Sequence, residues 1–375
     1  MVSPDYTGRS MRKTVLLLLL FSLPLLAQKR AKNVILLLGD AGGVATLNAA
    51  SILGHGEPQK LYIQSMPYIG LSDTSTDSQW VSDSAAGMTA VVTGVKTQNG
   101  VISEGPETVR GKTDGKPLKT ILEYAEEHGL STGVITNMPV VDATPAACYS
   151  HANDRKAFST IFQQLFKPRF GDGVDVLIGP GRGDIEKALK ADGLEMTALA
   201  QQAGRMMYPS VSAIPADAHQ AIAIFDKRDD FSLPEAVDRA VKMLSANKKG
   251  YFLMIEGDMH TSGKVEPGLR RALELDDIIR KLSKTVSKDT LILFTADHSF
   301  DLRMHGGLKG KPLLTAEDKP EGKGYRGGAV RMDDTHTGEE VIVAAQGPGA
   351  SAVHGYMPNT KIFHIMMSAL GWKEN

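Results

Sequence analysis

The chain contains only one cysteine, Cys148, which rules out an intrachain disulfide, a zinc ribbon and a thiolate cluster. Any bound metal ion would therefore have oxygen and imidazole ligands. The chain also lacks an excess of charge of either sign, with 42 Lys and Arg against 43 Asp and Glu. This balance gives no electrostatic reason to expect nucleic acid or an anionic membrane as a partner.

No hydrophobic run is long enough to span a bilayer comfortably. The apolar residues 14–26 follow the basic Met11-Arg12-Lys13 and precede the small Ala27, which is the pattern of a secretory signal peptide. We predict a signal peptide over residues 1–28, with Met11 as an alternative start, and a periplasmic or secreted protein with no membrane span after its removal. An uncleaved N-terminal anchor is the alternative.

Short apolar runs alternate with longer helical patterns over the rest of the chain, as in a mostly parallel sheet covered on both faces. We predict one domain over residues 29–375, a three-layer α/β/α sandwich. Residues 301–335 show little periodicity, and we expect a long loop or small lid there. The predicted strands are Asn33–Leu38, Thr132–Thr136, Val174–Ile178, Ala221–Phe225, Tyr251–Ile255, Thr290–Phe294 and Val341–Ala345.

Acidic residues follow three of these strands. Asp40 follows the first, Glu256 the fifth, and Asp297-His298 the sixth. Ligand sites in such sheets lie beyond the carboxyl ends of the strands, and three carboxylates at one edge repel one another unless cations neutralise them. A single strand-end Asp is usually a turn or helix cap, but the three together predict a divalent metal site.

Small residues around Ser84 predict a helix that ends near Gly94. Ser84 would lie at its N-terminus, where free backbone N–H groups favour an anion. Asp83 or Ser84 acting only as a helix cap is the simpler interpretation. Because no Gly-x-Ser-x-Gly turn or Ser-His-Asp order surrounds Ser84, a metal ion is the better candidate for activating its hydroxyl.

Five short motifs in order resemble the alkaline phosphatases over roughly residues 32–371. They are Asn33–Asp40, Asp83-Ser84-Ala85, Asp142–Ala146, Thr295–His298 and His336-Thr337-Gly338. The resemblance implies that Ser84 attacks phosphorus and that Arg155 clamps the phosphate. It also implies that Asp83 and Asp142 contact the residues or waters of the site rather than the substrate. Asp142 would order the water ligands of a magnesium ion.

The resemblance also implies a set of metal ligands. Asp40 would bridge a zinc and a magnesium ion, with Asp297 and His298 completing the zinc that activates Ser84. Thr144 and Glu256 would complete the magnesium site. His336 matches a ligand of a second zinc ion, which activates water in the family.

The pattern breaks at this second zinc. The family places an Asp five residues after Glu256 and a His four residues further on, where this chain has Thr261 and Val265. Asp258 and His260 are candidate substitutes, since alternate residues of an extended strand share a face and both side chains suit zinc. The alternative is a surface turn and a site with one zinc fewer.

We therefore expect hydrolysis of small phosphate monoesters through a phosphoserine at Ser84, with one or two Zn²⁺ and Mg²⁺. A same-fold phosphodiesterase or sulfatase is an alternative, as is a noncatalytic metal- or phosphate-binding protein permitted by the altered zinc site. The resemblance also makes a homodimer possible.

Overall fold

The structure is a computed structural model that describes Met1 and residues 30–215, 217–315, 318–322 and 324–373. The predicted signal peptide therefore falls, apart from Met1, outside the described residues. None of the helices in the described part of the chain is long and apolar enough to cross a bilayer.

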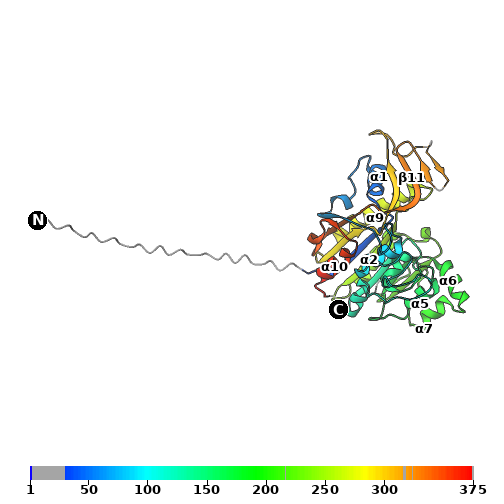
Figure 1. The fold of residues 1–375 in the computed structure, drawn as a ribbon. Helices are drawn as coiled ribbons and strands as arrows, with labels where there is room; N and C mark the ends of the chain where they lie inside the picture. The colour runs from blue at the N-terminus through cyan, green and yellow to red at the C-terminus, as the bar shows by residue number, and fades with distance from the viewer. Residues whose placement is uncertain (2–29, 216, 316–317, 323, 374–375) are drawn as a thin grey trace.

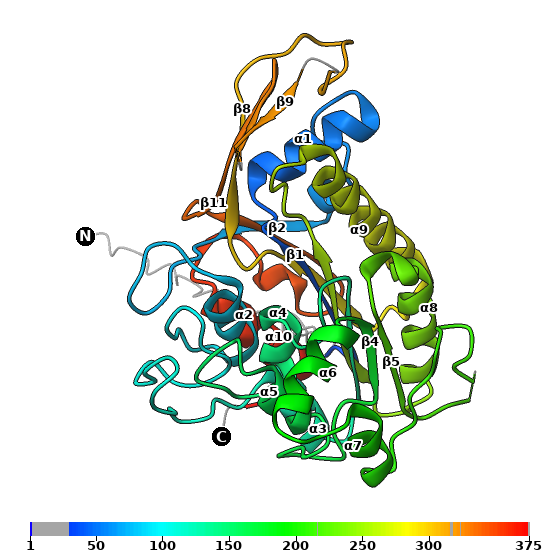
Figure 2. The same ribbon diagram turned by 90° about the vertical axis from the view of Figure 1, so that its right-hand side faces the viewer.

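A nine-stranded sheet forms the centre of the molecule (Figures 1 and 2). Its strand order is β13-β2-β12-β7-β1-β6-β3-β4-β5, and pairing is parallel from β7 to β5. All seven predicted strands are confirmed within two or three residues. The strands are β1 (Asn33–Asp40), β2 (Tyr68–Ser72), β3 (Ser131–Thr136), β4 (Val176–Pro180), β5 (Ala221–Phe225), β6 (Tyr251–Asp258), β7 (Thr290–Thr295), β12 (Val341–Gln346) and β13 (Gly355–Met357).

Helices cover both faces of this sheet, which confirms the predicted three-layer sandwich (Figure 2). Side chains of β1 alternate between two apolar cores, with Leu36 in one and Leu37 in the other. The first core includes α2 (Ser84–Thr93), α3 (Ile121–Glu127), α4 (Ala143–Tyr149), α5 (Phe158–Gln164), α6 (Arg182–Ala191), α7 (Met196–Gln202) and α10 (Thr360–Leu370). The second includes α1 (Val44–His55), α8 (Leu233–Leu244) and α9 (Val265–Thr285).

A second, smaller sheet corrects the expectation of a loop over residues 301–335. It has the order β8-β11-β10-β9 and is antiparallel, with β8 (Ser299–Met304), β9 (Lys319–Glu321), β10 (Gly324–Arg326) and β11 (Val330–Thr337). Figure 2 shows it projecting beyond α1. β8 and the start of β11 alternate apolar and polar residues, and Phe300, Leu302, Val330 and Met332 are buried in the second apolar core. These runs are short, and residues rich in Gly, Lys and Asp separate them. Whether this segment acts as a lid stays a prediction.

The small sheet is attached directly to the candidate site. β8 begins one residue after His298, and β11 contains His336 near its end. His336 pairs with Phe300 and Thr337 with Ser299 across the two strands, so their pairing brings the two histidines together.

Candidate active site

The acidic residues that follow separate strands meet at one edge of the central sheet. β1 lies between β7 and β6, with Leu38 opposite both Thr295 and Glu256 and Asp40 opposite Asp258. This parallel register brings Asp40, Glu256 and Asp297 to the same edge, as expected from their positions at the carboxyl ends of the strands.

Asp40, Asp297 and His298 form a compact, fully buried group beside Ser84. His298 Nε2 lies 3.4 Å from Asp40 Oδ1, 3.5 Å from Asp297 Oδ2 and 3.3 Å from Ser84 Oγ. Ala41 adopts a left-handed backbone with φ of 63°, and its N–H donates to Asp297 Oδ1 at 3.4 Å. The turn after β1 therefore ties the two carboxylates together.

The imidazole of His298 is held in the form that binds metal ions. Its Nδ1 lies 3.0 Å from the Ser299 carbonyl and donates to it, which leaves the Nε2 lone pair facing the two carboxylates and Ser84. Burial lowers the pKa of His298 to about 4, against the opposing effect of Asp297, so the ring stays neutral.

Ser84 is the first residue of α2 and is 3% exposed. Asp83 caps the helix by accepting from the N–H of Ala86 at 3.1 Å, so the capping interpretation is correct for Asp83. Gly87 allows the close approach of the helix to the site, because an added Cβ would lie 2.5 Å from the Asp297 carbonyl oxygen. Gly94 ends the helix in a left-handed conformation with φ of 75°, as predicted.

A second group of buried oxygen atoms lies around Glu256. Its carboxylate accepts from the Thr136 hydroxyl, while Glu256 Oε1 has no hydrogen-bond partner. Burial raises the pKa of Glu256 to about 8, with further contributions from Asp142, Asp297 and Asp258. Burial also raises the pKa of Asp40 well above its usual range, followed by the effects of Asp297 and Glu256.

Unpaired oxygens support cation binding at this edge. Four buried side-chain oxygens of the predicted ligands lack a hydrogen-bond partner in the described structure, namely Asp40 Oδ1, Asp297 Oδ2, Glu256 Oε1 and Thr144 Oγ1. Buried polar atoms are rarely left unpaired, and mutually repelling buried carboxylates are costly. Divalent cations would satisfy both requirements, so these residues fit the metal ions that the sequence implies.

Arg155 lies between two of the predicted supporting carboxylates. Its Nη1 is 3.1 Å from Asp83 Oδ2 and its Nη2 is 3.1 Å from Asp142 Oδ1. Burial alone would lower the pKa of the guanidinium, but Asp142 and Asp83 raise it further above its usual range. Arg155 is therefore charged and held against Asp83, the residue before Ser84, with N–H groups left over for a ligand.

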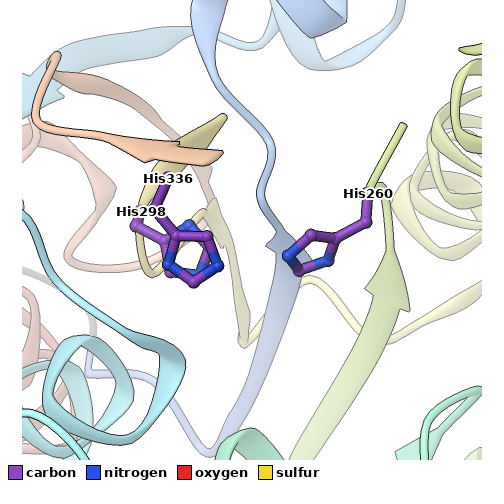
Figure 3. A group of neighbouring side chains, drawn as sticks. All are labelled: His260, His298 and His336. Atoms are coloured by element: carbon purple, nitrogen blue, oxygen red, sulfur yellow. The ribbon is translucent and has the colours of Figure 1, made fainter. Parts of the chain in front are cut away.

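A cluster of three imidazoles adjoins the Ser84 group. Possible ligand nitrogens of His260, His298 and His336 all lie within 4.8 Å of one another. His298 stacks on His336 with ring centroids 3.7 Å apart, and His260 faces the pair from the end of β6 (Figure 3). His336 Nδ1 lies 3.0 Å from the Ser82 carbonyl and donates to it. The structure therefore brings His260 next to His336, at the position where the sequence lacks the usual ligands.

Asp258, the other proposed substitute ligand, is not part of this imidazole cluster. Its carboxylate contacts His260 Nδ1 at 2.8 Å, Arg228 Nη2 at 2.7 Å and Arg271 Nη2 at 3.1 Å. Burial would raise the pKa of Asp258, but the His260 hydrogen bond and the two arginines outweigh it and lower the pKa to about 2. Asp258 is thus ionised and already paired.

The positions where the family has an Asp and a His hold Thr261 and Val265, which cannot replace a carboxylate and an imidazole. Thr261 is fully buried, and its Oγ1 has no hydrogen-bond partner among the described residues. Val265 is the first residue of α9 and belongs to the second apolar core. Positions 261 and 265 therefore provide neither the carboxylate nor the imidazole that the family has there.

Sequence reasoning missed three residues that shape the site. Thr136 hydrogen-bonds Glu256, while Arg228 and Arg271 hold Asp258. Thr136 could have been found, because it ends a predicted strand that lies beside β6. The two arginines give no such signal, since they lie on η2 (Arg228–Asp230) and α9 at ordinary surface-type positions.

Comparison with known proteins identifies the class. The family model "Alkaline phosphatase" matches residues 31–210, 195–319 and 328–372. The tissue-nonspecific alkaline phosphatase isozyme of Homo sapiens is 30% identical, covering 90% of this chain and 83% of the relative. The alkaline phosphatase of Escherichia fergusonii is 28% identical, covering 92% of this chain and 87% of the relative.

Solved structures agree with the fold. Alkaline phosphatase from the Antarctic bacterium TAB5 is similar with a TM-score of 0.76 at 22% identity, covering 92% of this chain and all of that one. The Thermus thermophilus alkaline phosphatase gives a TM-score of 0.75 at 21% identity, covering 92% and 93% of the two chains.

The architecture and the relatives define a phosphatase-type hydrolase. Because the family model covers nearly all of the described chain, the family is also shown. The chain belongs to the alkaline phosphatase family.

Proposed function

We propose that the protein hydrolyses small phosphate monoesters through a phosphoserine formed at Ser84. The observation that supports this most directly is the position of the Ser84 hydroxyl, 3.3 Å from His298 Nε2 and next to the buried Asp40–Asp297–His298 group. A serine with no conventional base triad, adjacent to a cation-binding group, has the arrangement that metal-assisted phosphoryl transfer requires.

Ser84 and Arg155 bind and orient the phosphoryl group in different ways. Ser84 lies at the N-terminus of α2, where the helix dipole and free N–H groups favour the negatively charged phosphoryl group. Arg155 presents its remaining N–H donors to two nonbridging oxygens, held in place by Asp83 and Asp142. The dianionic charge of a monoester benefits from both features.

Ser84 Oγ attacks phosphorus, the bond from phosphorus to the leaving oxygen breaks, and the proton lost by Ser84 is balanced by the one gained by the leaving alcohol. Water then cleaves the Oγ–phosphorus bond, releasing inorganic phosphate and restoring the Ser84 hydroxyl. Burial lowers the pKa of His298 to about 4, which favours the neutral ring that a metal ion requires.

Two groups of residues would hold the metal ions. Asp40, Asp297 and His298 suit Zn²⁺, and the oxygen donors Asp40, Glu256 and Thr144 suit Mg²⁺. When bound, the cations would neutralise the carboxylates and increase the acidity of the Ser84 hydroxyl and of water. His260 and His336 are the candidates for a further Zn²⁺.

The decisive experiment compares Ser84→Ala with Ser78→Ala, an exposed serine of the preceding loop that contacts Gln98. Ser84→Ala should retain its metal content, lose turnover of an aryl phosphate and give no phosphoserine after trapping at low pH. Ser78→Ala should behave as wild type. Phosphoserine elsewhere, or persistent turnover in Ser84→Ala, would refute the mechanism.

The same assay separates the alternatives. Rates on an aryl phosphate, a phosphodiester and an aryl sulfate should rank in that order for a monoesterase. Tight phosphate binding by wild type without turnover of any of the three would instead indicate a noncatalytic binding protein.

Export and homodimerisation stay predictions that these residues do not address. N-terminal sequencing of protein recovered outside the cytoplasm would test cleavage near residue 28, and light scattering of the purified protein would test the dimer.

A further inference from the structure

The end of β6 and the residues after it form a network of buried contacts that is not expected of a simple surface turn. Asp258, at the end of the strand, is 4% exposed and accepts from both the backbone N–H and the ring Nδ1–H of His260, at 2.9 and 2.8 Å. Its other carboxylate oxygen accepts from Arg228 at 2.7 Å and forms an ion pair with Arg271 at 3.1 Å. We propose that Asp258 is a positioning residue, held by these two arginines, that orients His260 for a cation shared with His336.

The hydrogen bonds decide which ring nitrogens are available. His260 donates Nδ1–H to Asp258, and His336 donates Nδ1–H to the Ser82 carbonyl. These bonds occupy Nδ1 of each ring and leave Nε2 as the atom available to a metal ion. The two ring centroids are 5.6 Å apart, and Figure 3 shows His260 pointing toward His336.

Asp258 itself is poorly placed to be a ligand of the same cation. Both of its oxygens already accept hydrogen bonds, and two guanidinium groups offset its charge. A carboxylate that fixes the far side of a histidine is a common supporting element of metal sites. Its role here is therefore to hold the tautomer and the direction of the His260 ring.

Arg271 holds the backbone of this segment as well as the carboxylate. From α9, its Nε donates to the Asp258 carbonyl at 2.6 Å and its Nη2 to the His260 carbonyl at 2.8 Å. Arg228 donates to the Asn137 carbonyl at 3.0 Å, and the Asn137 side chain accepts from Asp258 N at 2.9 Å. Residues 258–260 are thus fixed from two sides.

This arrangement predicts the properties of the cation site. Imidazole ligands carry no negative charge, so a site built on His260 and His336 should bind its cation more weakly than one that includes a carboxylate. Imidazole ligands should also favour Zn²⁺ or Co²⁺ over Mg²⁺. The inference rests on the proposed function only in assuming that divalent cations bind at this edge of the sheet.

The test measures metal binding directly, with no need for turnover. Purified metal-free protein is titrated with Zn²⁺ by calorimetry, and bound zinc is counted after dialysis. His260→Ala and His336→Ala should each lose the same single equivalent. Asp258→Asn and Arg271→Ala should keep the stoichiometry but bind that equivalent about 10- to 100-fold more weakly.

Arg270→Ala is the matched control, because Arg270 is the neighbouring residue on α9 and its exposed side chain pairs with Glu266 rather than with residues 258–260. It should bind zinc as wild type does. Arg271→Lys guards against misfolding of the alanine variant, since it keeps the charge but cannot bridge both carbonyls, and it should weaken binding less than Arg271→Ala. Circular dichroism verifies that each variant is folded.

Three results would overturn the inference. The first is loss of a whole equivalent of zinc in Asp258→Asn, which would make Asp258 a ligand. The others are an unchanged zinc stoichiometry in His260→Ala and equal zinc affinity in Arg271→Ala and Arg270→Ala. The cobalt-loaded protein adds a second measurement, since the visible spectrum should change in His260→Ala and keep its band positions in Asp258→Asn. Failure of the phosphatase assay alone would leave these binding results, and the inference, intact.

Discussion

Arg155 is the residue whose substitution tests the proposed phosphate site most sharply. Both of its terminal nitrogens already contact carboxylates, Asp83 and Asp142, and the side chain is 16% exposed. Arg155→Ala would remove the phosphate contacts and leave two carboxylates uncompensated beside a dianionic substrate. We expect a lower affinity for the phosphoryl group in both the substrate and the transition state.

The size of the effect follows from the contacts. Each charge-assisted hydrogen bond contributes about 1.5–3 kcal/mol. Arg155 would make two such bonds to the phosphoryl group while it also contacts Asp83 and Asp142, so the two bonds together should contribute about 3 kcal/mol. That corresponds to about a 150-fold loss in kcat/KM. Arg155→Lys keeps the charge but loses the planar fork, so about half of this free energy and about a tenfold loss are expected.

The assay compares kcat/KM for an aryl phosphate with the inhibition constant of inorganic phosphate. Both should worsen by similar factors in Arg155→Ala, because phosphate makes the same contacts. Arg110→Ala is the control, since Arg110 forms an exposed pair with Asp154 on the same loop. Changes below about threefold in Arg155→Ala, or equal changes in Arg110→Ala, would refute the reasoning.

Three further predictions concern stability and metal content. A chelator should abolish activity and lower Tm, because the buried carboxylates of Asp40, Glu256 and Asp297 then repel one another; scanning calorimetry before and after restoring Zn²⁺ and Mg²⁺ tests this. Burial raises the pKa of Glu126 to about 8 from 4.5, so the folded state binds a proton that the unfolded state releases, and this contribution is present below pH 4.5 and lost as pH rises to 8. Urea titrations from pH 5 to 9 should show a loss on the order of 5 kcal/mol in wild type that Glu126→Gln lacks and the exposed Glu127→Gln keeps. Leu275→Ala, in the fully buried face of α9, should cost about 2–5 kcal/mol in the same titrations, and the exposed Asp277→Ala should cost under about 0.5 kcal/mol.

Local sequence patterns were sufficient for most of the central sheet. A strand of a parallel sheet is buried on both faces and therefore needs a continuous apolar run. All seven predicted runs form strands of the central sheet. The buried face of α9 was equally legible, since Leu275, Ile278, Ile279 and Leu282 repeat at helical spacing and all are buried. The edge strand β13 and its neighbour β2 were not predicted, because both are short and partly exposed.

The sequence also determined where Asp40, Glu256 and Asp297 would meet, because the ends of parallel strands share one edge of the sheet. It could not determine what each side chain would contact there. Asp258 and His260 looked like equivalent substitutes along the strand, yet only His260 faces the other imidazoles. Asp258 contacts Arg228 and Arg271, which come from η2 and α9, and no local pattern reveals a contact between segments so far apart in the chain.

The small sheet shows the same division. The many Gly, Lys and Asp residues of this segment resembled a loop, and they hid the short alternation of apolar and polar residues along β8 and at the start of β11. Only tertiary pairing of β8 with β11 brings His298 and His336 together across the register. The amino-acid sequence thus determined which chemical groups are available at the site, and long-range packing determined which of their atoms face one another.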